Sequence, residues 1–306
     1  MLRVAFQMDS DVIVGRDVTV KFIQEAQRRG HEVFFYQPNT LSFFETAVVA
    51  DACSVAVRNN SLVFGNKAKL DLESVHILFI RQNPPFDMRY ITTTYLLERL
   101  TNVLFINDPK SIRNNPEKLL PLSFPEFIPP TLVTENASDI CEFYEEYGDV
   151  VMKPLYSYGG HGVVRICGAT SIRVISEVMV ERYCAPVVVQ KFIPNEGADK
   201  RVILLSGRPV GVIKRKVSLA SEIRANMRVG AVPCATELSE REYAICAAVG
   251  GKISSEIAFA GIDLLEGYLL EINITSPCGI LEINDVYDRT LEKDCWDHFE
   301  SMLSSA

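Results

Sequence analysis

The chain of 306 residues is long enough for two or three packed domains. Its 48% hydrophobic and 23% charged residues are typical of a globular protein, and the net charge of −8 gives no general attraction to nucleic acid or to an anionic membrane. No apolar run is long enough to cross a bilayer, and the chain opens with a strand pattern instead of a signal peptide. We therefore expect a cytoplasmic protein that has neither a nucleic-acid nor a membrane partner.

The N-terminal third alternates strand and helix patterns. Residues 17–29 have helical periodicity and are followed by Gly30, a favourable residue after a helix C-terminus. A strand–helix–strand start of this kind is typical of a doubly wound parallel sheet. We expect helices at 17–29 and 91–100, and strands at 2–8, 32–36, 77–81 and 103–106, with further strands or a hairpin at 54–63 and 69–71.

Polar residues follow the buried strand at 77–81. Arg81 ends this strand, and Gln82 and Asn83 come before a pair of prolines. In open α/β sheets, ligands bind at the carboxyl ends of the strands. This stretch is therefore a candidate ligand site.

The middle of the chain starts with a proline-rich stretch, 116–130, which we interpret as a domain boundary. A compact α+β unit is expected next, with helices at 138–147, capped by Ser138, and 172–182, and strands at 150–153, 163–166 and 187–192. Strands at 200–205 and 210–215, a polar stretch at 218–228 and a long helix at 240–258 complete the pattern. The predicted domains are residues 1–120, 121–195 and 196–306.

A glycine-rich turn joins two of these strands. Gly159, Gly160 and Gly162 let backbone N–H groups approach phosphate oxygens, although a simple β-turn explains them equally well. Lys153 ends the preceding strand, and Lys118 lies at the domain boundary. Each suits a phosphate contact as a compact charge; alternatively, each is an ordinary surface lysine. The turn is neither a P-loop nor a dinucleotide fingerprint, because no G-K-[ST] follows and no helix starts there.

Two further segments leave alternatives open. The strand at 187–192 leads into a segment typical of an interdomain hinge, whose backbone either reads an adenine edge or only connects two domains. Arg201 opens another strand, and Arg224 lies in the polar stretch. Arginines suit bidentate capture of a carboxylate or a transferring phosphoryl group, and a charged surface loop explains them equally well.

Residues 261–280 predict a β-hairpin around Glu266-Gly267. Alternation puts two groups of apolar residues toward the core, Ile262 and Leu264 on the first strand and Leu270, Ile272 and Ile274 on the second. A three-residue loop, 266–268, with Gly267 at positive φ, places Asp263 opposite Glu271, whereas a two-residue loop puts Asp263 on the other face.

With the longer loop, Asp263, Glu271 and Asn273 share one face of the hairpin. Two carboxylates and an amide oxygen form a hard-oxygen set that suits Mg²⁺. The alternative is a solvated strand face. The eight scattered cysteines contain no C-x-x-C pair and predict free thiols, and Cys278 has no histidine near it in sequence, so we interpret it as structural. The four histidines lack metal-ligand spacing and nucleophile partners, which disfavours a zinc enzyme and a serine or cysteine hydrolase.

The order of these features resembles the ATP-grasp superfamily and, within it, the bacterial glutathione synthetases. The resemblance extends over nearly the whole chain. Its most specific segments are Arg-x-x-Pro-Pro-Phe-Asp at 81–87 and Glu-Ile-Asn-Ile-Thr-Ser-Pro at 271–277. Other matching segments are 94–99, 107–109, 117–119, 129–134, 199–202 and 261–263.

The resemblance implies an α/β protein of ATP-grasp architecture, with an N-terminal doubly wound parallel-sheet domain and an α+β lid. It implies an ATP-dependent carbon–nitrogen ligase that joins γ-glutamylcysteine to glycine through an acyl phosphate, giving glutathione, ADP and phosphate. The implied metal ion is Mg²⁺ or Mn²⁺, with ATP as co-substrate, and the implied assembly is a homotetramer or homodimer.

The resemblance also assigns roles to residues. It implies that nucleotide binds at Lys118, Lys153, Gly159, Gly160, Gly162, Gln190, Lys191, Ile193 and Asp199. The implied metal ligands are Asp263, Glu271 and Asn273. The groups implied to stabilise the transferring phosphoryl and the acyl phosphate are Arg201 and Arg224, and those implied to hold the substrates are Arg81, Asn226, Ser276 and Pro277.

Two segments depart from the family pattern. Gln82 and Asn83 stand where the family often has Lys-Asp, which removes two charges from the implied peptide site. Gly230-Ala231 stands where the family usually has a glycine pair, and Arg228 adds a charge before it. Two alternatives stay open: another ATP-grasp carboxylate–amine ligase, and a nucleotide-binding regulator without turnover. The intact metal and phosphate residues favour the ligase.

Overall fold

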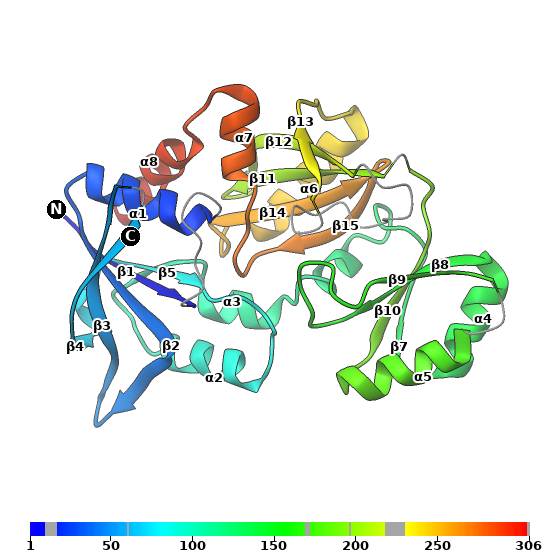
Figure 1. The fold of residues 1–306 in the computed structure, drawn as a ribbon, viewed down its shortest axis with the longest axis horizontal. Coiled ribbons are helices and arrows are strands. Elements are labelled where there is room, and N and C mark those ends of the chain that lie inside the picture. The colour runs from blue at the N-terminus through cyan, green and yellow to red at the C-terminus, as the bar shows by residue number, and fades with distance from the viewer. Residues whose placement is uncertain (10–16, 60, 169–171, 196, 218–229, 305–306) are drawn as a thin grey trace.

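The computed structural model describes residues 1–9, 17–59, 61–168, 172–195, 197–217 and 230–304. These residues form three β-sheets, of six, four and five strands, with helices packed on their faces (Figure 1). The mixed α/β architecture confirms the predicted fold class. None of the helices in these ranges combines the length and the apolar character that a membrane crossing requires.

The N-terminal sheet has the strand order β4-β3-β2-β1-β5-β6. Its elements are β1 (Arg3–Met8), α1 (Val18–Arg28), β2 (Glu32–Phe44), β3 (Ala47–Arg58), β4 (Ser61–Asp71), η1 (Leu72–Ser74), β5 (Ile77–Arg81), α2 (Met88–Leu97), β6 (Leu104–Ile106) and α3 (Pro109–Asn114). Strands β2, β1, β5 and β6 run parallel, as predicted, and β3 and β4 extend the sheet as an antiparallel hairpin. Helix α2 starts three residues earlier than predicted because Asp87 caps it, accepting from the N–H groups of Arg89 and Tyr90.

The central sheet is antiparallel, with the order β7-β10-β8-β9. Its elements follow η2 (Leu120–Ser123) and are β7 (Thr131–Thr134), α4 (Ala137–Tyr147), β8 (Asp149–Pro154), β9 (Val164–Cys167), α5 (Ile172–Tyr183) and β10 (Val187–Lys191). Both helices pack on the sheet through a shared apolar core (Figure 1). The predicted cap of α4 is wrong: Asn136, not Ser138, accepts the first N–H, because its side-chain oxygen reaches the backbone nitrogen of Ser138 at 2.9 Å.

The C-terminal sheet has the order β13-β12-β11-β14-β15. Its elements are β11 (Ala198–Leu205), β12 (Arg208–Lys216), β13 (Val232–Cys234), α6 (Glu240–Ile253), β14 (Phe259–Leu265), β15 (Tyr268–Asn273), α7 (Ile280–Tyr287) and α8 (Leu291–Leu303). Helix α6 ends before the predicted residue 258, because the carbonyl of Ala258 already accepts from Ser206 as the chain enters β14.

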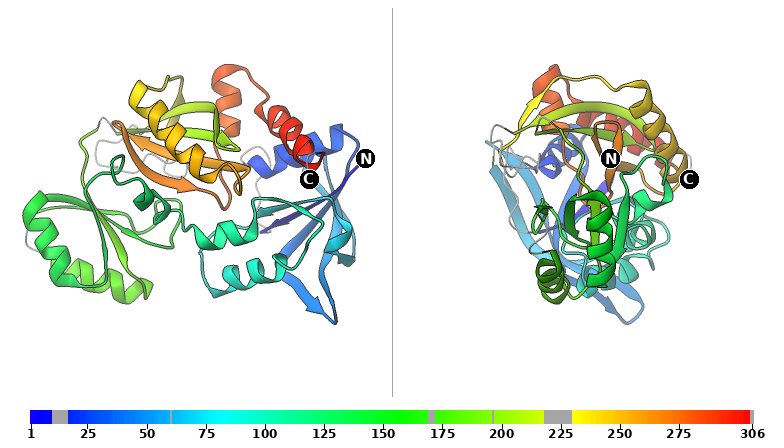
Figure 2. Two further views of the ribbon diagram at one scale, coloured as in Figure 1. Left: turned by 180° about the vertical axis from the view of Figure 1, so that it is seen from behind. Right: turned by 90° about the vertical axis from the view of Figure 1, so that its right-hand side faces the viewer.

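The first and last parts of the chain share one aromatic core. Helix α8 lies beside α1, as the view from behind shows (Figure 2). Trp296 of α8 is fully buried, and its indole N–H donates to the carbonyl of Phe22 at 3.0 Å. The ring of Phe22 in turn lies 5.5 Å from those of Phe79 and Phe259, which belong to the N-terminal and C-terminal sheets. This packing fixes the two sheets against each other, and we retain the division at residues 120 and 195 as a proposal.

Asn107 makes a second connection between the same two sheets. Its Nδ2 donates to the carbonyls of Phe259, at 2.6 Å, and Ile274, at 2.8 Å. Its Oδ1 accepts from the N–H of Phe259 at 2.8 Å. The side chain is buried, so no water replaces these bonds if they are lost.

Asn107→Ala should lower the free energy of unfolding by about 3 kcal/mol, because it leaves three buried backbone groups unpaired. Urea denaturation followed by tryptophan fluorescence measures the loss. The control is Asn102→Ala, at an exposed asparagine whose side chain bonds Glu73 among the described residues, and it should cost about 0.5 kcal/mol or less. Equal losses in the two variants would contradict the connecting role of Asn107.

Candidate active site

A cavity of about 390 Å³ is lined by residues from all three sheets. Charged side chains of both signs surround it. The basic residues are Arg81, Lys118, Lys153, Lys191, Arg201 and Arg215, and the acidic residues are Asp17, Glu117, Asp199, Asp263, Glu271 and Glu282. Basic groups beside a cluster of carboxylates suit a polyanion that binds together with a metal cation.

The turn of the β14–β15 hairpin differs from the prediction. Leu265 pairs with Tyr268, so the turn contains only Glu266 and Gly267. Both residues have positive φ, 48° and 76°, as a type I′ turn requires. The predicted three-residue loop, 266–268, is therefore wrong.

A β-bulge nevertheless produces the predicted register. It lies between Asp263 and Leu264 of β14 and adds Leu270 to β15, so that Asp263 pairs with Glu271. Leu270 lines the cavity, and Leu269 is fully buried in its place. The prediction that Leu270 faces the core is wrong, because the bulge shifts the alternation by one residue.

Asp263 is held by two arginines. Arg201 donates from Nε to Oδ1 at 2.5 Å and from Nη2 to Oδ2 at 2.8 Å, and Arg215 Nη2 lies 3.0 Å from Oδ1. Burial alone raises the pKa of Asp263, but the two guanidinium groups outweigh burial and lower it to about 2. The carboxylate is therefore ionised throughout the physiological pH range.

Sequence reasoning missed Arg215. This residue donates from Nε and Nη2 to the two oxygens of Asp199 at 2.7 and 2.6 Å, so it bridges Asp199 and Asp263. Burial raises the pKa of Asp199, although its contact with Arg215 opposes that shift. Strand alternation could have indicated this residue. Arg215 lies two residues after the buried Ile213, so the two side chains share the buried face of β12, where a charge needs a partner.

Glu271 and Asn273 lie on the same strand face as the paired Asp263. Glu271 Oε1 is 3.2 Å from Lys118 Nζ, and Asn273 Nδ2 is 3.5 Å from Asp263 Oδ2. The arginine bonds occupy only part of the acceptor capacity of the Asp263 carboxylate. The oxygen atoms of these three side chains fit a hard divalent cation. The described ranges hold no cluster of three His, Cys, Asp or Glu, and this set contains two carboxylates, with the Asn273 amide as the third ligand.

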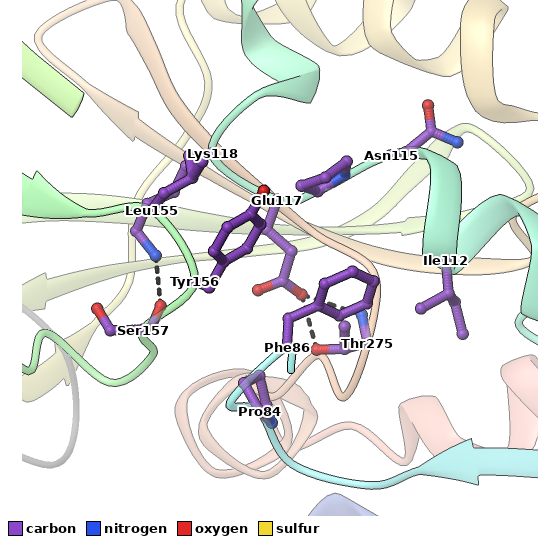
Figure 3. Close-up of a pocket in the computed structure, with 11 residues that line it drawn as sticks. Pro84, Phe86, Ile112, Asn115, Glu117, Lys118, Leu155, Tyr156, Ser157 and Thr275 are labelled. Carbon is purple, nitrogen blue, oxygen red and sulfur yellow. Dashed lines mark hydrogen bonds between the residues drawn. The ribbon is translucent and has the colours of Figure 1, made fainter. Parts of the chain in front are cut away.

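The segment that enters the central domain contributes two opposed charges. Lys118 Nζ donates to the carbonyl of Ser157 at 2.5 Å, and Glu117 Oε1 accepts from the N–H and hydroxyl of Thr275 at 3.0 and 2.8 Å (Figure 3). Burial raises the pKa of Glu117, and the charge of Glu271 adds to this effect. These bonds hold the segment against the glycine turn on one side and the end of β15 on the other.

Lys153 lies beside the predicted phosphate turn. Its Nζ donates to Gln190 Oε1 at 2.7 Å, and burial lowers its pKa to about 8. Gly159, Gly160 and Gly162 have positive φ of 62°, 74° and 76°. The first two line the cavity, whereas a Cβ at Gly162 would lie 2.7 Å from Pro154 Cγ and 2.3 Å from the Tyr183 hydroxyl. The structure thus places Gly162 at a tight contact inside the central domain.

The predicted hinge forms one wall of the cavity. Gln190, Lys191 and Ile193 all line it, and the backbone N–H of Lys191 donates to the carbonyl of Pro130 at 3.0 Å. Apolar side chains of both neighbouring sheets face the same space, namely Val151, Leu265 and Leu270. An apolar slot beside hinge backbone is suited to a flat heteroaromatic ring.

The predicted substrate residues lie at another part of the cavity. Arg81 is buried and donates from Nε to Thr19 Oγ1 and from Nη2 to the carbonyl of Pro277, both at 3.1 Å. Ser276 Oγ donates to Asn83 Oδ1 at 3.3 Å. Cys278, interpreted from the sequence as structural, is exposed and lines this region. The predicted residues Arg224 and Asn226 lie outside the described residues.

Comparison with known proteins identifies the family. Residues 2–113 match the prokaryotic glutathione synthetase N-terminal domain, and residues 117–288 match the prokaryotic glutathione synthetase ATP-grasp domain. The chain is 64% identical to the glutathione synthetase of Anaplasma centrale over 304 residues, covering 99% of this chain and 98% of the relative. The chain belongs to the prokaryotic glutathione synthetase family. It is also 38% identical to the glutathione synthetase of Brucella melitensis biotype 1, covering 98% of this chain and 99% of that relative.

Solved structures share the fold at low identity, among them the ATP-grasp ligase PsnB, which aligns with a TM-score of 0.62 and 17% identity over 98% of both chains. D-cycloserine synthetase DcsG aligns with a TM-score of 0.68 and 14% identity, covering 99% of both chains. D-alanyl-alanine synthetase A from Vibrio cholerae aligns with a TM-score of 0.62 and 10% identity, covering 97% of this chain and 98% of that one. The predicted ATP-grasp architecture of this glutathione synthetase family member is therefore confirmed.

Arg215→Met should lower the free energy of unfolding by about 3 kcal/mol or more, because it leaves the buried Asp199 carboxylate without its cation. Urea denaturation of the ligand-free protein measures this loss. Adding Asp199→Asn to Arg215→Met should recover at least half of the lost stability, since the unpaired charge is then removed.

The control for this prediction is Arg289→Met, which breaks an exposed ion pair with Asp294. It should change the stability by about 0.5 kcal/mol or less. A double variant no more stable than Arg215→Met alone would show that Arg215 stabilises the fold through packing, with little contribution from the pairing of its charge.

Proposed function

We propose that this chain is an ATP-dependent ligase that joins γ-glutamylcysteine to glycine, giving glutathione, ADP and phosphate. The observation that carries the proposal is membership of the prokaryotic glutathione synthetase family over both of its domains. The cavity supports it, since the oxygen set of β14 and β15 faces lysines and a glycine turn across one space.

A carboxylate does not form an amide at neutral pH, because its oxygen is a poor leaving group. Phosphorylation of the cysteinyl carboxylate gives an acyl phosphate, from which an amine displaces phosphate. The protein then has to position the reactants and neutralise their charge, without itself forming a covalent bond.

We assign the nucleotide to the region between the hinge and the metal hairpin. Lys118 and Lys153 contact phosphates, and the turn at Gly159 and Gly160 closes over them. The base lies in the apolar slot beside Gln190, Lys191 and Ile193. Asp199 orients Arg215, and Gly162 keeps the turn compact.

We assign the divalent cation to Asp263, Glu271 and Asn273. A cation held by these residues would neutralise charge on the nucleotide phosphates and on the transferring phosphoryl group. Oxygen ligands of this type accept Mg²⁺ and Mn²⁺ alike, and we propose Mg²⁺ as the resident ion.

Arg201 and Arg215 lie beside the metal carboxylate and are suited to stabilise the acyl phosphate. Arg81, with the Ser276-Pro277 turn, is assigned to the peptide. Arg224 and Asn226 stay predictions of the same kind, from the sequence alone. The homotetramer or homodimer and the cytoplasmic location stay predictions too.

The direct test is ADP release from Mg·ATP in the presence of γ-glutamylcysteine and glycine, with each component omitted in turn. Full turnover should require all of them, and mass spectrometry should identify glutathione. ADP release that is indifferent to the dipeptide would remove the substrate assignment, and a different amine that supports faster turnover would redirect it.

The pKa of Lys153 predicts how nucleotide binding depends on pH. Burial holds this pKa at about 8 in the free protein, and phosphate favours the charged amine, so binding above pH 8 must be accompanied by proton uptake. Affinity for Mg·ADP should therefore fall several-fold between about pH 7 and about pH 9. Calorimetry in buffers of different ionisation enthalpy measures both effects.

The control for this pH dependence is Lys153→Met, which should bind nucleotide more weakly and show no proton uptake in the same range. A variant that keeps the pH dependence of the unmodified protein would show that another group titrates on binding.

A further inference from the structure

Five of the six carboxylates that line the cavity have partners. Asp17 accepts from the backbone of α1, and Glu117 accepts from the end of β15. The other three lie against basic side chains: Asp199 against Arg215, Asp263 against Arg201 and Arg215, and Glu271 against Lys118. Each of these carboxylates therefore has a structural or charge-pairing role.

Glu282 is the exception. It is the third residue of α7 and lines the same cavity. Its Oε2 is buried without a hydrogen-bond partner, and no ion pair to this residue is present in the described part of the chain. The side chain as a whole is half-buried, so its charge keeps some contact with water, but the buried oxygen has no donor among the described residues. An unpaired carboxylate oxygen in a ligand cavity indicates a cationic ligand.

The loop before α7 sets the position of Glu282. Arg201 Nη1 donates to the carbonyl of Cys278 at 3.0 Å. Gly279 has a φ of 128°, and a Cβ there would lie 3.1 Å from Arg201 Cγ. The two residues before α7 are thus packed against the side chain of Arg201, which is assigned above to the acyl phosphate.

We propose that the Glu282 carboxylate binds the ammonium group of the incoming amino acid and accepts its proton. This inference rests on the proposed function. An ammonium group has no lone pair, so one proton must leave before nitrogen attacks. The amine then forms the C–N bond, the C–O bond to phosphate breaks, and phosphate leaves with the electron pair and takes up the second proton.

Metal binding is a poorer explanation of Glu282, since it belongs to no group of three His, Cys, Asp or Glu within the described ranges. The metal ion and three of the basic side chains, Lys118, Arg201 and Arg215, already have carboxylates assigned to them. Two reactants carry an ammonium group, glycine and the γ-glutamyl end of the dipeptide. We assign the glycine ammonium to Glu282, because the loop that leads into α7 bonds Arg201, the residue assigned to the acyl phosphate.

The test is Glu282→Gln, which keeps the shape of the side chain and removes its charge. The KM for glycine should rise about tenfold or more, the loss expected for a hydrogen bond to a charged group, while the KM values for ATP and γ-glutamylcysteine change less than about twofold. Hydroxylamine, which is uncharged at neutral pH, should replace glycine with similar efficiency in both proteins, and the hydroxamate is measured as its iron complex.

The matched control is Asp285→Asn, which removes the same charge from an exposed position on α7 outside the cavity. It should leave the KM for glycine unchanged. Thermal unfolding of the ligand-free proteins adds a second readout. Glu282→Gln should melt at the same temperature as the unmodified protein or higher, whereas a structural role for the carboxylate predicts a lower melting temperature.

An unchanged KM for glycine in Glu282→Gln, or an equal loss with glycine and hydroxylamine, would overturn the assignment. These outcomes differ from a failure of the proposed function, in which the unmodified protein makes no glutathione from γ-glutamylcysteine and glycine. Full activity of the unmodified protein together with either result would remove only the role of Glu282.

Discussion

The carboxylate of Asp263, bonded by Arg201 and Arg215, is the contact on which the rest of the cavity depends. The three residues lie on three adjacent strands, β14, β11 and β12, and each of their charges is compensated only when all three strands are in register. A slip of one residue would bury a charge without its partner, at a cost of several kcal/mol. The same register brings Glu271 opposite Asp263, so one electrostatic constraint positions both the two arginines and the proposed metal ligands.

The hairpin shows how far alternation can predict a site. Period-two alternation assigns residues to faces only while both strands are regular. Here the turn is one residue shorter than predicted and a bulge adds one residue to β15, so the two differences cancel at Asp263. They do not cancel at Leu270, which lies inside the bulge. A bulge depends on how two strands fit the surrounding sheet, and that information is absent from a local pattern.

The motif residues could be predicted from the sequence because each follows a strand or helix whose apolar pattern is recognisable in the sequence. Lys153, for example, ends an apolar strand, and the glycine turn comes next. Arg215 and Glu282 belong to no such motif. Arg215 matters because it pairs with two buried carboxylates, and Glu282 because its carboxylate has no basic partner in the described part of the chain. That relation joins residues from distant parts of the chain and becomes visible only in three dimensions. The packing of Trp296 against Phe22 has the same origin, because 274 residues separate them in sequence.

The charge pairs of the cavity also explain how it can receive a highly charged ligand. Without ligand, Lys118 lies 3.2 Å from Glu271 and compensates its charge. When nucleotide and cation bind as proposed, the cation takes Glu271 as a ligand and a phosphate takes Lys118, so one ion pair is exchanged for two. Neither Lys118 nor Glu271 is left unpaired at any stage, which avoids the desolvation penalty of an isolated buried ion. A protein of net charge −8 can in this way keep a site for the proposed polyanion, because half of the acidic groups around that site are already paired with its own basic side chains.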